Sequence, residues 1–129
     1  TWTAGSTLTM LGGSAILNAA PATVVMNNGA RTTFETDGLT WPTITAQGGC
    51  ILEWLAGGTV TTLTMTNGCT FDKSGDARAL TITNSTIDGD SCQFIDSLNA
   101  ITWTNATTVN QQVAQGPFQF TGPRTVKVT

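Results

Sequence analysis

A pentad of alternating apolar and polar residues recurs along the chain. Three copies read apolar, Thr, apolar, Thr, Asn, and they occupy residues 63–67, 80–84 and 101–105. Weaker copies lie at residues 8–12, 24–28, 44–48 and 118–122. Alternation with a period of two is typical of a β-strand that buries one face. The sequence therefore predicts seven short strands, one in each copy.

The copies follow one another at intervals of 16 to 21 residues, measured between their closing Asn or Gly residues. Such intervals are too short for a helix between strands and too regular for an ordinary sandwich. We interpret the chain as an all-β protein, a right-handed parallel β-helix of about seven irregular coils. The right hand is expected because coil length varies, whereas left-handed β-helices tend to keep a hexapeptide rhythm. The coils form a single domain over residues 1–129, and a β-sandwich or jelly roll is the alternative.

Stacked coils would bring equivalent residues into columns about 4.8 Å apart. The positions four and two residues before each closing residue are all apolar, namely Leu8, Val24, Ile44, Leu63, Leu80, Ile101 and Phe118, then Met10, Met26, Ala46, Met65, Ile82, Trp103 and Phe120. A second inward column contains Ile16, Thr32, Leu52, Phe71, Asp88, Val109 and Val126. Because Asp88 does not suit an interior, we expect a one-residue slip that places Ile87 inside. Segments 38–41 and 92–95 are candidates for a third strand.

The closing Asn or Gly of each copy predicts a sharp corner. Both residue types tolerate a left-handed backbone conformation better than other residues do. Stacked Asn side chains can also form hydrogen bonds from coil to coil. The predicted corner ladder consists of Asn28, Asn67, Asn84 and Asn105.

Threonine dominates the outward positions of the predicted strands. The candidate contact face comprises Thr7, Thr9, Thr23, Thr43, Thr45, Thr62, Thr64, Thr66, Thr81, Thr83, Thr102, Thr104 and Thr121. An array spaced about 4.8 Å in one direction and about 7 Å in the other resembles the Thr-x-Thr face of insect-type antifreeze proteins, and that resemblance implies ice binding. The alternatives are a contact with another subunit or partner, and a plain exposed surface, because Thr is a favourable strand residue.

The composition of the chain argues against several kinds of site and partner. The chain has 129 residues, including 27 Thr and 14 Gly, with no His and no Tyr. Only 10% of residues are charged and the net charge is −3, which argues against a nucleic-acid partner. The lack of His removes the commonest general base and metal ligand, and no apolar run is long enough for a membrane span. We therefore expect no catalytic residues, no cofactor, no metal and no membrane partner.

Two pairs of residues with reactive side chains would lie side by side on adjacent coils. Cys50 and Cys69 share one interior column, where parallel stacking favours two buried thiols over a disulfide. Glu53 and Asp72 each follow a corner by five residues on adjacent coils. Stacking would place their carboxylates about 5 Å apart, the separation of a retaining glycosidase pair. The alternative is a pair of solvated turn acids.

The variable coils and the Asn corners resemble the right-handed parallel β-helices of polysaccharide lyases and phage tailspikes. The chain also resembles phage capsid decoration (cement) and fibre proteins in its low charge, its abundant Thr and Gly, and its short length. Those proteins are commonly trimers. This resemblance implies a non-enzymatic structural protein on a virion or in an extracellular assembly, a homo-oligomer acting by contact with a larger assembly such as a capsid. The alternatives are an ice-binding protein and a glycan-binding or glycan-cleaving module.

Overall fold

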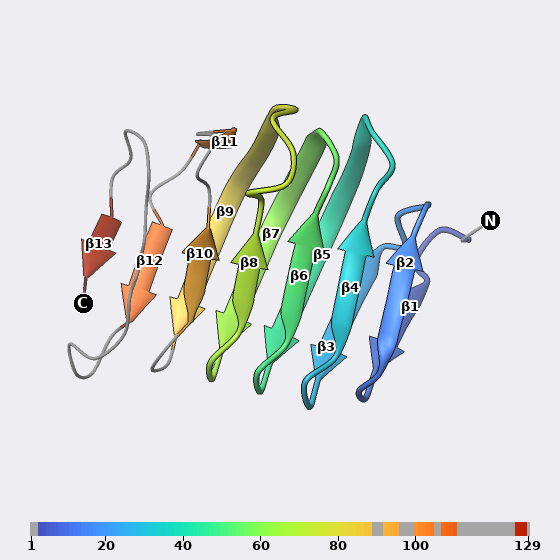
Figure 1. Cartoon of the computed structure of the whole chain (residues 1–129), viewed down its shortest axis with the longest axis horizontal. Coiled ribbons are helices and arrows are strands. Elements are labelled where there is room, and N and C mark those ends of the chain that lie inside the picture. Colours follow the sequence, from blue (N-terminus) through green and yellow to red (C-terminus); the bar gives the residue numbers. More distant parts are fainter. Residues whose placement is uncertain (1–2, 89–91, 96–99, 105–106, 111–125, 129) are drawn as a thin grey trace.

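The computed structural model describes residues 3–88, 92–95, 100–104, 107–110 and 126–128, and every regular element within them is a β-strand (Figure 1). The larger sheet contains β1 (Thr7–Met10), β3 (Thr23–Asn27), β5 (Leu39–Gln47), β7 (Gly58–Thr66), β9 (Leu80–Asp88), β11 (Ile101–Trp103), β12 (Thr107–Asn110) and β13 (Val126–Val128). The smaller sheet contains β2 (Ser14–Leu17), β4 (Arg31–Phe34), β6 (Ile51–Trp54), β8 (Thr70–Asp72) and β10 (Gln93–Ile95). In the described part of the chain, no helix could cross a membrane.

All paired strands are parallel, and successive strands alternate between the two sheets from β1 to β10. In Figure 1 the chain ascends the near, smaller sheet and descends the far, larger sheet while advancing from right to left, which is a right-handed course. The predicted all-β, right-handed parallel β-helix is thus confirmed. The predicted coil number is wrong, because the solenoid has about four turns instead of about seven. Among the described residues the smaller sheet has no strand after β10.

The longer strands of the larger sheet turn a corner at their midpoints. Trp41 pairs with Val60, and Thr43 pairs with Thr62, but the register passes over Pro42, which has no amide hydrogen to donate. Buried positions are also three residues apart there, as at Trp41 and Ile44. Each strand therefore has an upstream arm before the corner and a downstream arm after it.

The upstream arm comprises residues 39–41, 58–60, 80–82 and 101–103, which are mutual register partners. The predicted third strand at 38–41 thus lies on this arm. The second candidate for that role, segment 92–95, is instead β10 of the smaller sheet.

The interior columns agree with the prediction through β7 and then diverge. Leu8, Val24, Ile44 and Leu63 are successive register partners. Leu63 is followed by Ser85, not by Leu80. Leu80 pairs with Gly58 and with Ile101, so this pentad lies on the upstream arm. The prediction failed here because both arms carry the same alternation of apolar and polar residues.

The second inward column also needs correction at four positions. Two of them, Val109 and Val126, lie on β12 and β13 of the larger sheet. The residue aligned with Thr32 is Ala15, and Ile16 points outward with 60% of its surface exposed. Asp88 lies on β9 of the larger sheet as the partner of Thr66. Ile87 is buried, as the sequence predicted, but it lies in the column of Met65 and not in this one. The observed column runs through Ala15, Thr32, Leu52, Phe71 and Phe94.

Aromatic side chains fill the interior between the smaller sheet and the upstream arm. Phe34 stacks on Trp54 with ring centroids 4.2 Å apart, and Trp54 stacks on Phe71 at 5.5 Å. Trp41 meets Phe34 and Trp54 edge to face. Because Phe34, Trp54 and Phe71 belong to successive turns, the stack runs along the solenoid axis and joins one turn to the next.

Candidate functional site

Two columns of outward residues cross the downstream arm from β1 to β9, and we call them the threonine face. The first column is Thr7, Thr23, Thr43, Thr62 and Asn84. The second column is Thr9, Val25, Thr45, Thr64 and Thr86. Parallel strands place neighbours in a column about 4.8 Å apart, and positions two residues apart on one strand about 7 Å apart. The structure therefore aligns seven of the thirteen predicted contact residues in these two columns.

The other predicted contact residues lie elsewhere. Thr66 extends a shorter third column with Gln47 and Asn27. Thr81 and Thr102 form a separate column on the upstream arm with Thr40 and Thr59, which the prediction missed. The remaining three are Thr83 at the strand corner, Thr104 just after β11, and Thr121, which lies outside the described residues.

Thr86 is a member of the threonine face that the prediction did not include. It pairs with Thr64 and is exposed. Its position two residues after Asn84 matches the Thr-x-Thr spacing of β5 and β7. This spacing is the sequence signal that would have found it once the corner was placed correctly.

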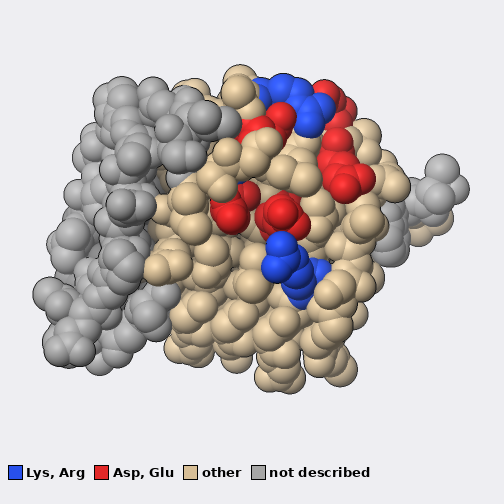
Figure 2. Space-filling view, viewed as in Figure 1, with Lys and Arg blue, Asp and Glu red and all other residues tan. Residues whose placement is uncertain are grey.

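The threonine face carries no charged residue, whereas the opposite side of the molecule is rich in charge. The ten positions in its two columns are eight Thr, one Val and one Asn. Figure 2, viewed from the side of the smaller sheet, shows acidic and basic side chains gathered there. Beyond β9, the backbone register extends the second column to Thr108 and then Lys127. A surface of methyl and hydroxyl groups can be covered without burying an unpaired charge.

The corner after the downstream arm is built from consecutive residues with positive φ. Asn28 and Asn67 have φ of 55° and 56°, and Gly48 occupies the equivalent place between them with φ of 75°. These two asparagines thus lie at corners, but Gly48 occupies the turn between them, so their side chains are not stacked on adjacent turns. Asn84 is not a corner residue, because it lies within β9 and its Nδ2 donates to the Thr61 carbonyl at 3.1 Å. Asn105 lies outside the described residues.

Three cysteines occupy one interior column beside this corner. The register aligns Cys50, Cys69 and Cys92, and all three are buried thiols. The thiols of Cys50 and Cys69 donate to the carbonyls of Gln47 and Thr66, each at 3.1 Å. A hydrogen bond with Cys92, together with burial, raises the pKa of the Cys69 thiol far above its ordinary value. A thiol held in this state is a poor nucleophile and metal ligand.

The carboxylates of Glu53 and Asp72 occupy neighbouring outward positions on β6 and β8, as the sequence predicted. Glu53 accepts hydrogen bonds from Arg31 at 3.2 Å and from Thr33 at 3.0 Å. Asp72 accepts two hydrogen bonds from Ser74, at 2.9 Å from its amide and 2.6 Å from its hydroxyl. Each carboxylate is thus engaged in a local structural contact, and we base no catalytic proposal on the pair.

A shallow hollow of about 370 Å³ lies on the smaller sheet beside Arg31. Its walls are Ser14, Ala15, Ile16, Arg31 and Thr33. No polar side chain in these walls is fully buried. The hollow therefore lacks the enclosed polar groups that orient a small ligand.

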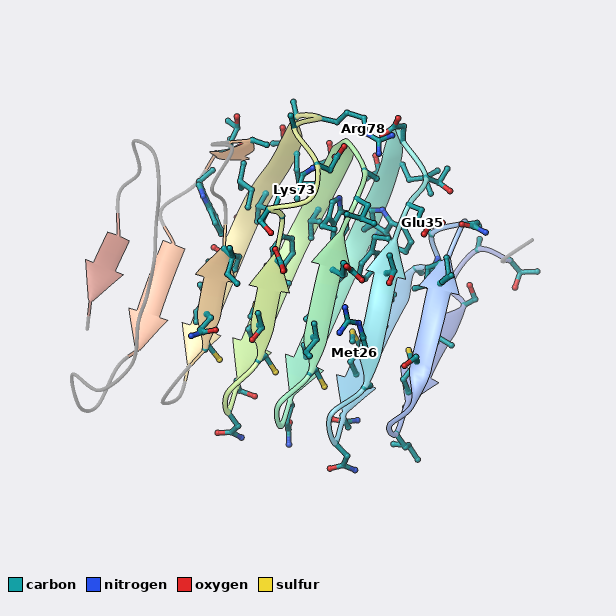
Figure 3. The ribbon with its side chains drawn as sticks, viewed as in Figure 1. Met26, Glu35, Lys73 and Arg78 are labelled. Carbon is teal, nitrogen blue, oxygen red and sulfur yellow. The ribbon has the colours of Figure 1, made fainter. Side chains whose placement is uncertain are left out.

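A network of charges joins loops 35–38 and 73–79, which lead from the smaller sheet to the upstream arm. Arg78 pairs with Asp37 from loop 35–38 and, at 2.7 Å, with Asp76. Lys73, which is fully buried, pairs with the other oxygen of Asp76 and donates to its main-chain carbonyl at 2.8 Å. Figure 3 shows Lys73 and Arg78 along the same, upper edge of the solenoid. We call these four residues the charge clamp.

The charge clamp predicts a loss of stability in acid. The Gly57 amide, followed by Arg78, lowers the pKa of Asp37 below 3.8. Burial opposes ionisation of Asp76, but hydrogen bonds from Lys73 and Arg78 outweigh it and lower its pKa below 3.8. Because both pKa values are lower in the folded state, their stabilisation is complete above pH 3.8 and declines as the pH falls through the folded values.

Thermal unfolding between about pH 5 and pH 2 measures this effect. The wild-type melting temperature should fall over this interval more steeply than that of Asp37→Asn. Parallel profiles for the two proteins would show that Asp37 contributes nothing to the acid dependence.

The fold and the threonine face define the class of this protein as a right-handed parallel β-solenoid with an aligned threonine face that carries no charged residue from β1 to β9. Comparisons of the chain with protein-family models, curated proteins and solved structures found no match.

Proposed function

We propose that this protein is a non-enzymatic structural module that assembles through its threonine face. The module forms a homo-oligomer, a trimer by analogy with the virion proteins that the sequence resembles, within a virion surface or extracellular assembly. The observation that supports this proposal is the division of the surface into one aligned, charge-free face and one charged side. Covering the charge-free side buries methyl groups without stranding a charge.

The central strands would supply the middle of such a contact. Thr45 and Thr64 are half-buried register partners on β5 and β7, with further threonines in the adjacent columns. Adjacent strands present these side chains in register, so a second copy would meet aligned columns of threonine. Contact area contributed in this way stabilises the assembly by mass action.

A lysine placed in the middle of the threonine face tests the proposal. Thr64→Lys should weaken self-association by at least about tenfold, because an unpaired ammonium is costly to bury in an interface. Thr70→Lys is the matched control, since Thr70 is also a half-buried outward residue on an interior strand, but of the smaller sheet. Sedimentation velocity across a concentration series measures both variants beside the wild type. A monomeric wild-type protein, or equal effects of the two lysines, would overturn the proposal.

Ice binding is the second candidate, and the in-register Thr-x-Thr array favours it. Pairs at Thr7 and Thr9, Thr43 and Thr45, and Thr62 and Thr64 are aligned on one flat side, with Val25 as the single apolar substitution. The same variants separate the candidates. Ice binding predicts thermal hysteresis in a monomeric wild-type protein, lost in Thr64→Lys and retained in Thr70→Lys. Absence of hysteresis in the wild type would eliminate this candidate.

A further inference from the structure

A second array of outward threonines lies on the upstream arm. Its first column is Thr40, Thr59, Thr81 and Thr102, which are successive register partners. The residues two positions later on the same segments are Pro42, Thr61, Thr83 and Thr104. All eight residues are at least partly exposed, and we call them the upstream face. The upstream face therefore repeats the Thr-x-Thr spacing of the threonine face.

The upstream face, like the threonine face, contains no charged residue. Its eight positions are seven Thr and one Pro. On the smaller sheet, by contrast, Arg31, Glu53 and Asp72 lie at outward positions (Figure 2). Asp37 and Arg78 border the upstream face in the loops that precede it, where they pair with each other. The described residues thus leave two sides of the solenoid uncharged and concentrate charge on the third.

The two uncharged faces share strands and meet at a corner. β5, β7 and β9 each carry both of them, with the upstream face before the corner and the threonine face after it. A contact between the threonine faces of two copies would leave both upstream faces in water. A contact between the threonine face of one copy and the upstream face of the next uses both uncharged sides. Head-to-tail contacts of this kind build closed rings or filaments.

We propose that the upstream face is an interaction surface whose partner is the threonine face of a second copy of this chain. The inference rests on the proposed function, since it takes self-association through the threonine face as given. The columns of both faces run from strand to strand along the solenoid with the same spacing of about 4.8 Å. Each threonine hydroxyl can both donate and accept a hydrogen bond, so two such surfaces need no fixed polarity to match. Their contact covers methyl groups and pairs hydroxyls without burying a charge.

Lysine substitutions on the two arms of one strand test this pairing of faces. Thr59 on the upstream arm and Thr64 on the downstream arm both belong to β7, and both are half-buried. Thr59→Lys and Thr64→Lys should each weaken self-association at least about tenfold, because each spoils one half of the contact. Thr70→Lys on the smaller sheet is the matched control. Sedimentation velocity across a concentration series measures association, and circular dichroism verifies folding. If Thr59→Lys does not fold, Thr81→Lys in the same column replaces it.

An equimolar mixture of the two variants gives the decisive result. Thr64→Lys retains an intact upstream face, and Thr59→Lys retains an intact threonine face. These two surfaces should join one copy of each variant into a heterodimer. The heterodimer cannot grow, because its two remaining faces both carry a lysine. A two-chain species should therefore appear in the mixture at concentrations where each variant alone is monomeric.

The outcomes separate this inference from the proposed function. If Thr64→Lys weakens association but Thr59→Lys behaves like Thr70→Lys, the proposed function stands and the upstream face is not its partner surface. If both variants are monomeric and their mixture contains no heterodimer, the two faces do not bind each other and the inference is wrong. A monomeric wild-type protein contradicts the proposed function itself, and this inference with it.

Discussion

Replacement of Trp54 with alanine is expected to lower the free energy of unfolding by about 3–5 kcal/mol, the range for a large buried aromatic residue. Trp54 is fully buried, and it contacts aromatic rings on both neighbouring turns, Phe34 at 4.2 Å and Phe71 at 5.5 Å. Alanine would leave a cavity at the centre of the aromatic stack. Since a domain of this size is commonly stable by only about 5–15 kcal/mol, a large fraction of the protein would unfold at moderate temperature.

Trp54→Phe is the matched control for this prediction. The indole Nε1 of Trp54 has no hydrogen-bond partner among the residues that the structure describes, so phenylalanine loses none of the described polar contacts while it retains the stack. We expect a loss below about 1.5 kcal/mol for this conservative exchange. Urea unfolding followed by far-ultraviolet circular dichroism measures both variants. Equal losses for alanine and phenylalanine would show that stacking at this position does not stabilise the solenoid.

Replacement of Asp76 alone with alanine is expected to lower the free energy of unfolding by about 3–5 kcal/mol, because it leaves the buried ammonium of Lys73 without its carboxylate. The Lys73 side chain is 0% exposed, and that of Asp76 is only 12% exposed. The variant retains only the main-chain carbonyl of residue 76 as an acceptor described for Lys73. The same substitution removes the 2.7 Å contact with Arg78, which helps to hold loop 73–79.

Removal of the lysine should have a much smaller effect than removal of the aspartate. In Lys73→Met the remaining Asp76 carboxylate is still paired with Arg78, and the methionine fills a similar volume. Replacement of a buried charge by an apolar side chain is often neutral or stabilising, so we expect a change within about 1.5 kcal/mol. Urea unfolding of the two variants gives the comparison. If Lys73→Met were as destabilising as Asp76→Ala, an unpaired buried charge would not be the cause.

The repeated pentad predicts the inward residues correctly in the early turns but not in the late ones. From β1 to β7 the corner-to-corner intervals are 16, 20 and 19 residues, as between Met10, Met26, Ala46 and Met65. Within this range the pentads and the Gly or Asn corners place every inward residue of the downstream arm correctly. The next interval, from Thr66 to Asp88, is 22 residues. The pentad at 80–84 lies inside it, where its closing Asn84 imitates a corner.

The candidate site was likewise only partly predictable. Alternation alone predicted Thr7, Thr9, Thr43, Thr45, Thr62 and Thr64 on one side, and in the structure these residues are aligned in two columns. The sequence did not predict that Thr86 belongs to the threonine face or that Thr81 lies in a separate column. Both positions depend on which arm of β9 each residue occupies. Both arms present the same alternation, so only the position of the chain in space distinguishes them.

The strands, their inward and outward residues and most of the tight corners were predictable from the sequence, because they follow from a two-residue period and from the backbone freedom of Gly and Asn. Which strands share a column was not predictable, since the register depends on the number of residues in each loop of the folded chain. Loop 73–79 is longer than 35–38 or 55–57 and is held by Arg78, whose partner Asp37 lies 41 residues away. No pattern of neighbouring residues in the sequence predicts such a contact. The length of the loop that it holds changes the register of the strands that follow.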